Sequence, residues 1–150
     1  MTPQFIRATP ADIDTLLSLM EDFYAHEGLA LDEQMARNAL GQILVNEQFG
    51  YVFLIETENE LAGYAVLTFG FSLEFRGRDA FVDELFLKPG HRGRGLGRQT
   101  LEFLAQTCRD LGIYGLHLEV ARENITAREL YRKTDFMDHD RYLMTRYLSP

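Results

Sequence analysis

The segment Arg92–Gly97 combines three glycines with two arginines, a composition suited to binding an anion through the backbone. It lies between residues with a strand pattern and residues with a helix pattern. Glycine lets an anion approach the backbone closely, and the first turn of a helix offers N–H groups without a partner inside the helix. The eleven residues from Lys88 to Arg98 carry four Lys or Arg side chains and no acidic one. The sequence therefore predicts a phosphate-type ligand at this loop.

Two well-known phosphate-binding motifs do not fit the same glycines. A P-loop has the pattern GxxxxGK[ST], and the spacing from Gly90 to Gly95 agrees with it, but Leu96 stands where the lysine is required. A dinucleotide fingerprint GxGxxG that starts at Gly93 ends on Arg98 instead of glycine. A tight glycine turn that leads into a helix and binds nothing stays open as an alternative at this point.

The composition indicates a folded domain with a local basic site. The chain has 150 residues and a formal net charge of −8, with 46% hydrophobic and 25% charged residues. Its sequence pI of about 4.9 argues against general nucleic-acid binding. Residues 1–75 contain two basic and 12 acidic side chains, whereas residues 76–150 contain 13 basic and 11 acidic ones. The basic loop is thus a local feature, which favours one anionic ligand bound there.

Several other classes of site are not indicated. No apolar run approaches the ~20 residues that span a membrane, and the N-terminal residues lack the pattern of a signal peptide. We therefore expect a cytoplasmic protein without a membrane partner. The four histidines and Cys108 show no metal-ligand spacing, so we expect no metal. Cys108 shares a helical stripe with Leu101, Leu104 and Leu111, which predicts a buried, inert thiol rather than a nucleophile.

The elements that must position the loop follow from the hydrophobic periodicity. Thr9, Pro10 and Asp12 predict a helix start. Pro89 and Gly90 end the strand before the loop, and Gly112 ends the helix after it. The resulting order is β-αα-βββ-α-β-α-β, a single mixed α/β (α+β) domain over residues 1–150. We expect strands at 4–8, 51–56, 61–69, 80–87, 116–120 and 141–148, and helices at 10–24, 33–44, 96–111 and 127–132.

Two motifs in the expected order carry a family resemblance. Arg92, Gly95 and Gly97 satisfy [QR]xxGx[GA], and about 30 residues later residues 124–136 match NxxAxxLYxKxGF except that Asp135 replaces the glycine. The opening Ile6-Arg7-Ala8-Thr9 and the block from Asp83 to Pro89 agree as well. The sequence thus resembles the GNAT superfamily of acetyl-CoA-dependent N-acetyltransferases from Phe5 almost to the C-terminus. If the glycine serves a positive φ, aspartate tolerates that conformation better than most residues.

The resemblance implies a fold, a reaction and a cofactor. The fold would be a central, mostly antiparallel mixed sheet of about six to seven strands flanked by about four helices. The reaction would be direct acetyl transfer from acetyl-CoA to a primary amine in a ternary complex, without a metal. The partner would be a small amine, not nucleic acid. The family is often dimeric, and the strand 141–148 could serve a homodimer interface.

The resemblance also assigns roles to individual residues. Tyr131 would sit near the thioester sulfur and protonate the leaving thiolate, and Asn124 would contact the cofactor arm. The backbone of the strand Leu85, Phe86 and Leu87 would pair with the pantetheine arm as an added strand. The CoA pyrophosphate would be held by the loop residues Arg92, Gly93, Arg94, Gly95, Leu96 and Gly97, with Arg98 beside them.

The acidic residues Asp83 and Glu84 are candidates for work on the amine. They are consecutive, so an undistorted strand sends only one of them toward a given face, whereas a β-bulge could turn both inward. At least one would order the water that removes the amine's proton, or would bind the ammonium; the alternative is one solvated carboxylate and one loop partner. Tyr24 and Glu27 fall where this family often lines its acceptor cleft, although a solvated helix end is the plainer interpretation.

The acceptor itself stays open. The strand from Val82 to Leu87 is similar to the polyamine and thialysine acetyltransferase branch, and the acidic N-terminal half would suit a small cationic or amino-acid-like amine. A protein N-terminal or lysine acetyltransferase is an alternative. So is a catalytically weak CoA-binding sensor that keeps the fold, and the presence of Tyr131 argues modestly against it.

Overall fold

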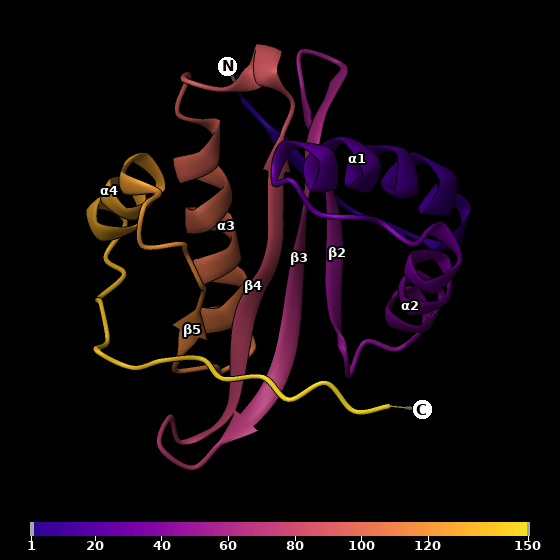
Figure 1. The fold of residues 1–150 in the computed structure, drawn as a ribbon. Coiled ribbons are helices and arrows are strands. Elements are labelled where there is room, and N and C mark those ends of the chain that lie inside the picture. Colours follow the sequence, from indigo (N-terminus) through magenta and orange to yellow (C-terminus); the bar gives the residue numbers. More distant parts are fainter. Residues whose placement is uncertain (1, 150) are drawn as a thin grey trace. The chain divides into compact units, whose positions relative to one another are not determined.

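A five-stranded sheet organises the first 119 residues of the computed structural model, which describes residues 2–149 (Figure 1). The strands follow their order in the sequence: β1 (Gln4–Arg7), β2 (Gly50–Thr57), β3 (Glu60–Ser72), β4 (Gly77–Leu87) and β5 (Leu116–His117). The first four pair antiparallel with their neighbours, and β5 pairs parallel with β4. The predicted mostly antiparallel mixed sheet is confirmed.

Helices cover both faces of this sheet (Figure 1). The helices α1 (Ile13–His26) and α2 (Glu33–Val45) share one core with the side chains of Val52 and Leu54 on β2. Phe53, which lies between them in the strand, faces the other way and contacts Phe103 of α3 (Leu96–Asp110) at 4.9 Å between ring centroids. This alternation explains why β2 reads as an almost continuous apolar run: both of its faces are buried. No helix in residues 2–149 combines the length and the apolar character needed to cross a bilayer.

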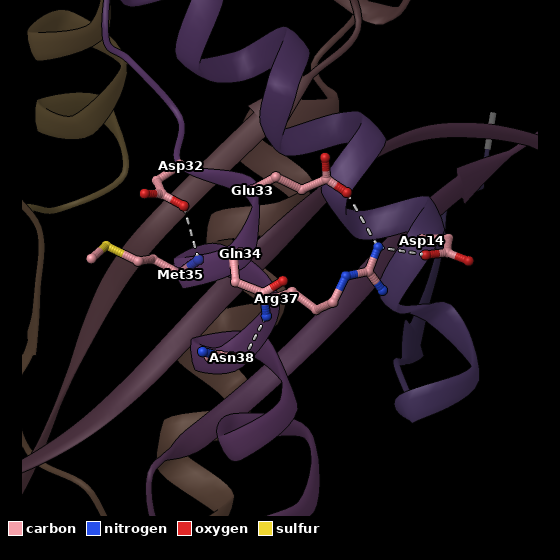
Figure 2. Close-up of polar contacts among 7 residues, drawn as sticks. All are labelled: Asp14, Asp32, Glu33, Gln34, Met35, Arg37 and Asn38. Carbon is pink, nitrogen blue, oxygen red and sulfur yellow. Dashed lines mark hydrogen bonds and ion pairs between the residues drawn. The ribbon is translucent and has the colours of Figure 1, made fainter.

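The helix starts follow the capping signals of the sequence. Thr9 forms a capping box with Asp12 over a short 3₁₀ turn, Pro10–Asp12, from which α1 continues. Asp32 caps α2 by accepting a hydrogen bond from the Met35 N–H at 3.1 Å (Figure 2).

Arg37 of α2 connects the two helices on this side of the sheet. Its guanidinium lies 3.0 Å from Asp14 of α1 and 3.3 Å from Glu33, one turn earlier in α2 (Figure 2). Because these groups are exposed, solvent screens both ion pairs and they contribute little to stability. The packing of the apolar faces therefore holds α1 and α2 on the sheet.

The C-terminal part differs from the prediction. Residues 120–150 form a second compact unit, which contains α4 (Ile125–Lys133) and no strand within the described residues. The expected strand at 141–148 is therefore wrong, and β5 has two residues instead of five, so the sheet has five strands rather than six or seven. The β-rich composition of 141–148 was a weak signal because a strand needs a partner ladder, and Tyr142, Met144 and Tyr147 are more than 80% exposed. The single domain and the homodimer stay predictions.

Both ends of α4 are built by residues of the second motif. Asn124 is the N-cap, and its side-chain oxygen accepts from the Ala127 N–H at 3.2 Å. At the other end Asp135 has φ 71°, and its N–H bonds to the Arg132 carbonyl while the Phe136 N–H bonds to the Tyr131 carbonyl. The rings of Tyr131 and Phe136 meet with 6.0 Å between centroids. This is a Schellman motif with its hydrophobic contact, and the positive φ expected of Asp135 is confirmed.

Replacing Asp135 with glycine is expected to stabilise this helix end by about 0.5–1 kcal/mol, because glycine adopts a positive φ without a Cβ penalty. Amide exchange at Phe136 should slow accordingly, which NMR can measure. Asp110→Gly is the matched control. Asp110 is the last residue of α3 and has a helical conformation, so glycine should destabilise that helix end. Unchanged or faster exchange at Phe136 in the Asp135 variant would contradict this account of the helix end.

Candidate active site

The glycine loop before α3 opens onto free space. After the 3₁₀ turn Pro89–His91, Gly93 has φ 75° and Gly95 has φ 81°, and Gly95 is the N-cap of α3. A Cβ built on either glycine would meet no heavy atom within 4 Å. By contrast, a Cβ on Gly63 of β3 would lie 1.9 Å from the Phe86 carbonyl oxygen. The loop glycines thus allow the positive φ angles of the turn, and they leave room above the backbone for an anion at the helix N-terminus.

The arginines of the loop brace its backbone. The Nε of Arg92 donates to the Leu87 carbonyl at 2.8 Å, and Arg94 donates to the Gly90 carbonyl at 2.9 Å. Arg94 also lies 3.2 Å from the Nδ1 of His91. Both arginine side chains are exposed, so their positive charge remains available to an anion at the loop. Of the predicted loop residues, Leu96 contributes only backbone, since its side chain is buried in the core.

The strand that leads into the loop has a partly unpaired edge. β4 pairs with β3 along its length, but β5 pairs with it only at Ala80 and Phe81. Beyond Phe81, no other strand within residues 2–149 covers that edge. The predicted pantetheine-binding residues Leu85, Phe86 and Leu87 lie on this stretch. An extended arm could add to such an edge by main-chain hydrogen bonds.

A β-bulge at Asp83 decides where the two acidic side chains lie. In the register of β3 and β4, Val66 pairs with Glu84 but Leu67 pairs with Val82, so Asp83 is an extra residue without a partner. A regular strand would put Glu84 on the same face as Val82. The bulge instead turns it to the face of Val66, which belongs to the core under α1 and α2. The bulge that the sequence left as an alternative is thus present.

Two tyrosines hold the Glu84 carboxylate. Tyr64 of β3 donates its hydroxyl to Oε1 at 2.7 Å, and Tyr24 of α1 donates to Oε2 at 2.5 Å. Tyr64 is fully buried, whereas Tyr24 and Glu84 are half-buried. Tyr24, predicted from its place near the end of the first helix, is therefore brought to Glu84.

Burial raises the pKa of Glu84, and the negative charge of Asp83 adds to the rise, whereas the hydrogen bonds from Tyr24 and Tyr64 lower it. Burial raises the pKa of Asp83 as well, although the residue keeps much of its exposure. The pKa values of both tyrosines are raised, by burial first and then by Glu84, so they remain protonated donors. The result is a desolvated carboxylate whose neutral partners leave its charge uncompensated.

Sequence reasoning missed Tyr64, although a signal was present. A tyrosine in the middle of an apolar strand must find a partner for its hydroxyl once it is buried. The nearest ionisable residues of the neighbouring strand were already candidates. The other predicted acceptor residue, Glu27, is the exposed C-cap of α1 and is not part of this cluster.

Tyr131 and Asn124 belong to the unit of residues 120–150 and are described within it. Tyr131 packs on Phe136, and Asn124 uses its side-chain oxygen to cap α4, which leaves its amide nitrogen as a donor. Their predicted roles at the cofactor stay predictions.

The rival nucleophile Cys108 is disfavoured by its surroundings. It is 3% exposed on the inner face of α3, and burial raises the pKa of its thiol to about 11. A thiol of that pKa is protonated at neutral pH and is a poor nucleophile.

Comparison with known proteins decides the family. The sequence model of the acetyltransferase (GNAT) family matches residues 13–136, which is most of the chain. The chain belongs to the GNAT family. The match includes the glycine loop, the bulged strand and α4, so the resemblance inferred from the two motifs is confirmed.

This GNAT chain is similar to curated N-acetyltransferases over part of its length. It is 40% identical over 63 residues to the uncharacterised N-acetyltransferase YycN of Bacillus subtilis, which covers 42% of this chain and 40% of that protein. It is 30% identical over 78 residues to the thialysine N-epsilon-acetyltransferase of Bos taurus, with 52% and 45% coverage. The matched segments thus span less than half of these relatives.

Solved structures agree over nearly the whole chain. A salt-marsh integron cassette protein superposes with a TM-score of 0.86 at 35% identity, covering 98% of this chain and 91% of that one. A protein of Clostridium acetobutylicum described as a predicted acetyltransferase, whose structure includes acetyl-CoA, superposes with a TM-score of 0.82 at 20% identity, covering 97% of this chain and 96% of that one. At that identity the second likeness concerns the fold alone.

Proposed function

We propose that this protein transfers the acetyl group of acetyl-CoA to a primary amine of a small cationic or amino-acid-like acceptor, by direct attack in a ternary complex. The observation that carries the proposal is the position of Glu84: a desolvated carboxylate lies on the one strand whose unpaired edge leads into an open glycine loop at a helix N-terminus. Family membership supplies the class of reaction.

The residues of the loop and strand fit acetyl-CoA. The open space above Gly93 and Gly95 suits a pyrophosphate, with the backbone amides of Arg92–Gly97 as donors and Arg98 nearby. The backbone of Leu85–Leu87 would hold the polar pantetheine arm by main-chain hydrogen bonds along the unpaired edge. When bound, acetyl-CoA supplies a thioester, an acyl group activated toward amines. Asn124 would contact the arm, and the phenol of Tyr131 would donate a proton to the sulfur as it leaves.

The acidic pair supports a cationic acceptor. The pKa of neither Asp83 nor Glu84 is lowered by a neighbouring cation. An ammonium group would therefore find uncompensated negative charge, with Tyr24 beside it and Glu27 at the end of the same helix. The amine must then lose a proton to expose its lone pair, and Glu84 would accept that proton through an ordered water. Relatives named for thialysine and streptothricin acetylation are consistent with amine acceptors.

The proposal is tested in two steps. Isothermal titration should show acetyl-CoA binding; no binding near millimolar concentrations would end both the enzyme and the CoA-sensor interpretation. A thiol-release screen over polyamines, amino acids, aminoglycosides and peptide N-termini should then identify an acceptor. Binding of acetyl-CoA without turnover on any of these amines would favour the sensor, and turnover only on peptides would favour a protein acetyltransferase.

Replacing Tyr131 with phenylalanine should lower kcat roughly tenfold to 30-fold while the Kd for acetyl-CoA changes little, because the ring is kept and only the proton donor is lost. The ring contact with Phe136 needs no hydroxyl and should be kept, and circular dichroism checks that the variant is folded. Steady-state kinetics and titration calorimetry measure the two constants. Unchanged kcat would remove Tyr131 from the acid role.

A further inference from the structure

Both oxygens of Glu84 are occupied by tyrosine hydroxyls that come from different elements. Tyr64 lies on β3, the strand that pairs with the bulged strand β4, and Tyr24 lies near the end of α1. Aromatic packing fixes the rings: Phe23 contacts Tyr24 at 5.7 Å and Tyr64 at 6.3 Å between centroids. Phe86, two residues after Glu84, contacts Phe23 at 5.6 Å. We call Tyr24, Glu84 and Tyr64 the tyrosine clamp.

We propose that Tyr24 and Tyr64 are positioning residues that fix the Glu84 carboxylate for proton transfer from the acceptor amine and keep its charge available to that amine. The role of the clamp in catalysis rests on the proposed function. The clamp itself is a feature of the fold, and its effect on Glu84 can be measured without turnover.

Geometry gives the first argument. A glutamate side chain has several rotatable bonds, and a carboxylate beside a bulge would otherwise sample several orientations. One hydrogen bond to each oxygen, from β3 on one side and α1 on the other, fixes the carboxylate plane. Each oxygen has two lone pairs and accepts one tyrosine, so each keeps one for a water or an ammonium.

The charge of the anchors gives the second argument. An arginine or lysine at the same place would hold the carboxylate equally well but would neutralise it. Phenols hold it and add no charge. Within residues 2–149, the ionised group that acts on the pKa of Glu84 is Asp83, in the same strand, and it is also negative. The clamp thus presents an oriented, uncompensated anion, which is what a cationic amine requires.

The clamp has a directional signature. Each tyrosine hydrogen bond favours the ionised form of Glu84 and so lowers its pKa, against the rise caused by burial. Removing one hydroxyl should therefore raise the pKa of Glu84, by about one pH unit. A base is active above its pKa, so the acid limb of kcat/KM should move to higher pH by the same amount.

The test compares Tyr24→Phe and Tyr64→Phe with Tyr51→Phe, a half-buried β2 tyrosine outside the clamp. The carboxyl carbon of Glu84 is followed by NMR against pH in glutamate-labelled protein, with Glu84→Gln to assign the signal, and kcat/KM is measured over the same range. We expect both clamp variants to raise the pKa of Glu84 and to shift the acid limb, and the control to change neither.

The outcomes separate the two proposals. An unchanged Glu84 pKa in Tyr24→Phe would overturn the clamp whether or not the protein acetylates an amine, and this half-buried position serves if Tyr64→Phe fails to fold. A raised pKa without an acceptor for the wild-type protein would leave the clamp standing and overturn the proposed function. A raised pKa with an unmoved acid limb would overturn the positioning role.

Discussion

Replacing Glu84 with glutamine is expected to lower kcat/KM for the acceptor amine by roughly 100-fold to 1000-fold, the usual contribution of a positioned general base. Glutamine keeps the size of the side chain, and its oxygen can still accept from one tyrosine. It cannot take up a proton. The loss should therefore fall on kcat/KM for the amine and leave the Kd for acetyl-CoA unchanged. Steady-state kinetics from pH 6 to 9 and titration calorimetry measure the two quantities.

Glu102→Gln is the matched control, because Glu102 is exposed on α3, away from the clamp. It should leave kcat/KM as it is. If Glu84→Gln retained most of its activity across this pH range, the base would have to be solvent or Asp83. Asp83→Asn would then decide between these two.

The same substitution has an effect on folding whose sign can be worked out. Burial raises the pKa of Glu84 in the folded state, so the folded protein holds this proton to higher pH than the unfolded chain does. The stabilising contribution is complete below the ordinary glutamate pKa and is lost as pH rises through the raised one. As pH rises through that window, the free energy of unfolding of the wild-type protein should thus fall relative to that of Glu84→Gln. Urea unfolding at several pH values would show it, and the opposite trend would contradict the burial of Glu84.

Replacing Gly95 with alanine is expected to weaken acetyl-CoA binding by about 100-fold, which corresponds to the loss of one or two charge-assisted hydrogen bonds to phosphate. Gly95 has a positive φ at the N-cap of α3, and the space above it is open. A methyl group would occupy the space that the pyrophosphate needs, and the strained backbone would turn the neighbouring amides. Titration calorimetry with acetyl-CoA and with CoA gives the comparison.

Gly112→Ala separates ligand contact from backbone strain. Gly112 lies just beyond the other end of α3, has φ 73°, and also has open surroundings. The two variants should lose similar stability, and only the Gly95 variant should lose affinity. Equal affinities for acetyl-CoA in both would show that the loop does not hold the pyrophosphate.

The parts of the fold and site that were predictable are those with a local cause. Thr9 and Asp32 cap their helices through bonds within three residues, and the loop glycines take the conformation that glycine alone adopts easily. The interior strands were predictable because burial on both faces leaves a long apolar run. The glycine loop and α4 motif were sufficient for the family.

The features that the sequence did not predict depend on residues far away in the chain. Residues 141–148 have the composition of a strand, but composition does not supply a neighbouring strand. The position of Glu84 depends on a one-residue bulge, which changes the face of every side chain after it, and the sequence left that bulge as an option. Tyr64 was missed because its role exists only in register with Glu84, 20 residues away.

The capping of α4 bears on how members of this family are recognised. The asparagine, tyrosine and phenylalanine of the second motif are the residues that begin and end a helix, through a side-chain cap and a ring contact. These contacts serve folding, so a chain could keep the signature without acetylating anything. A motif search therefore detects the architecture, and under the proposed mechanism a survey for active enzymes would also inspect the hydroxyl of Tyr131 and the carboxylate of Glu84.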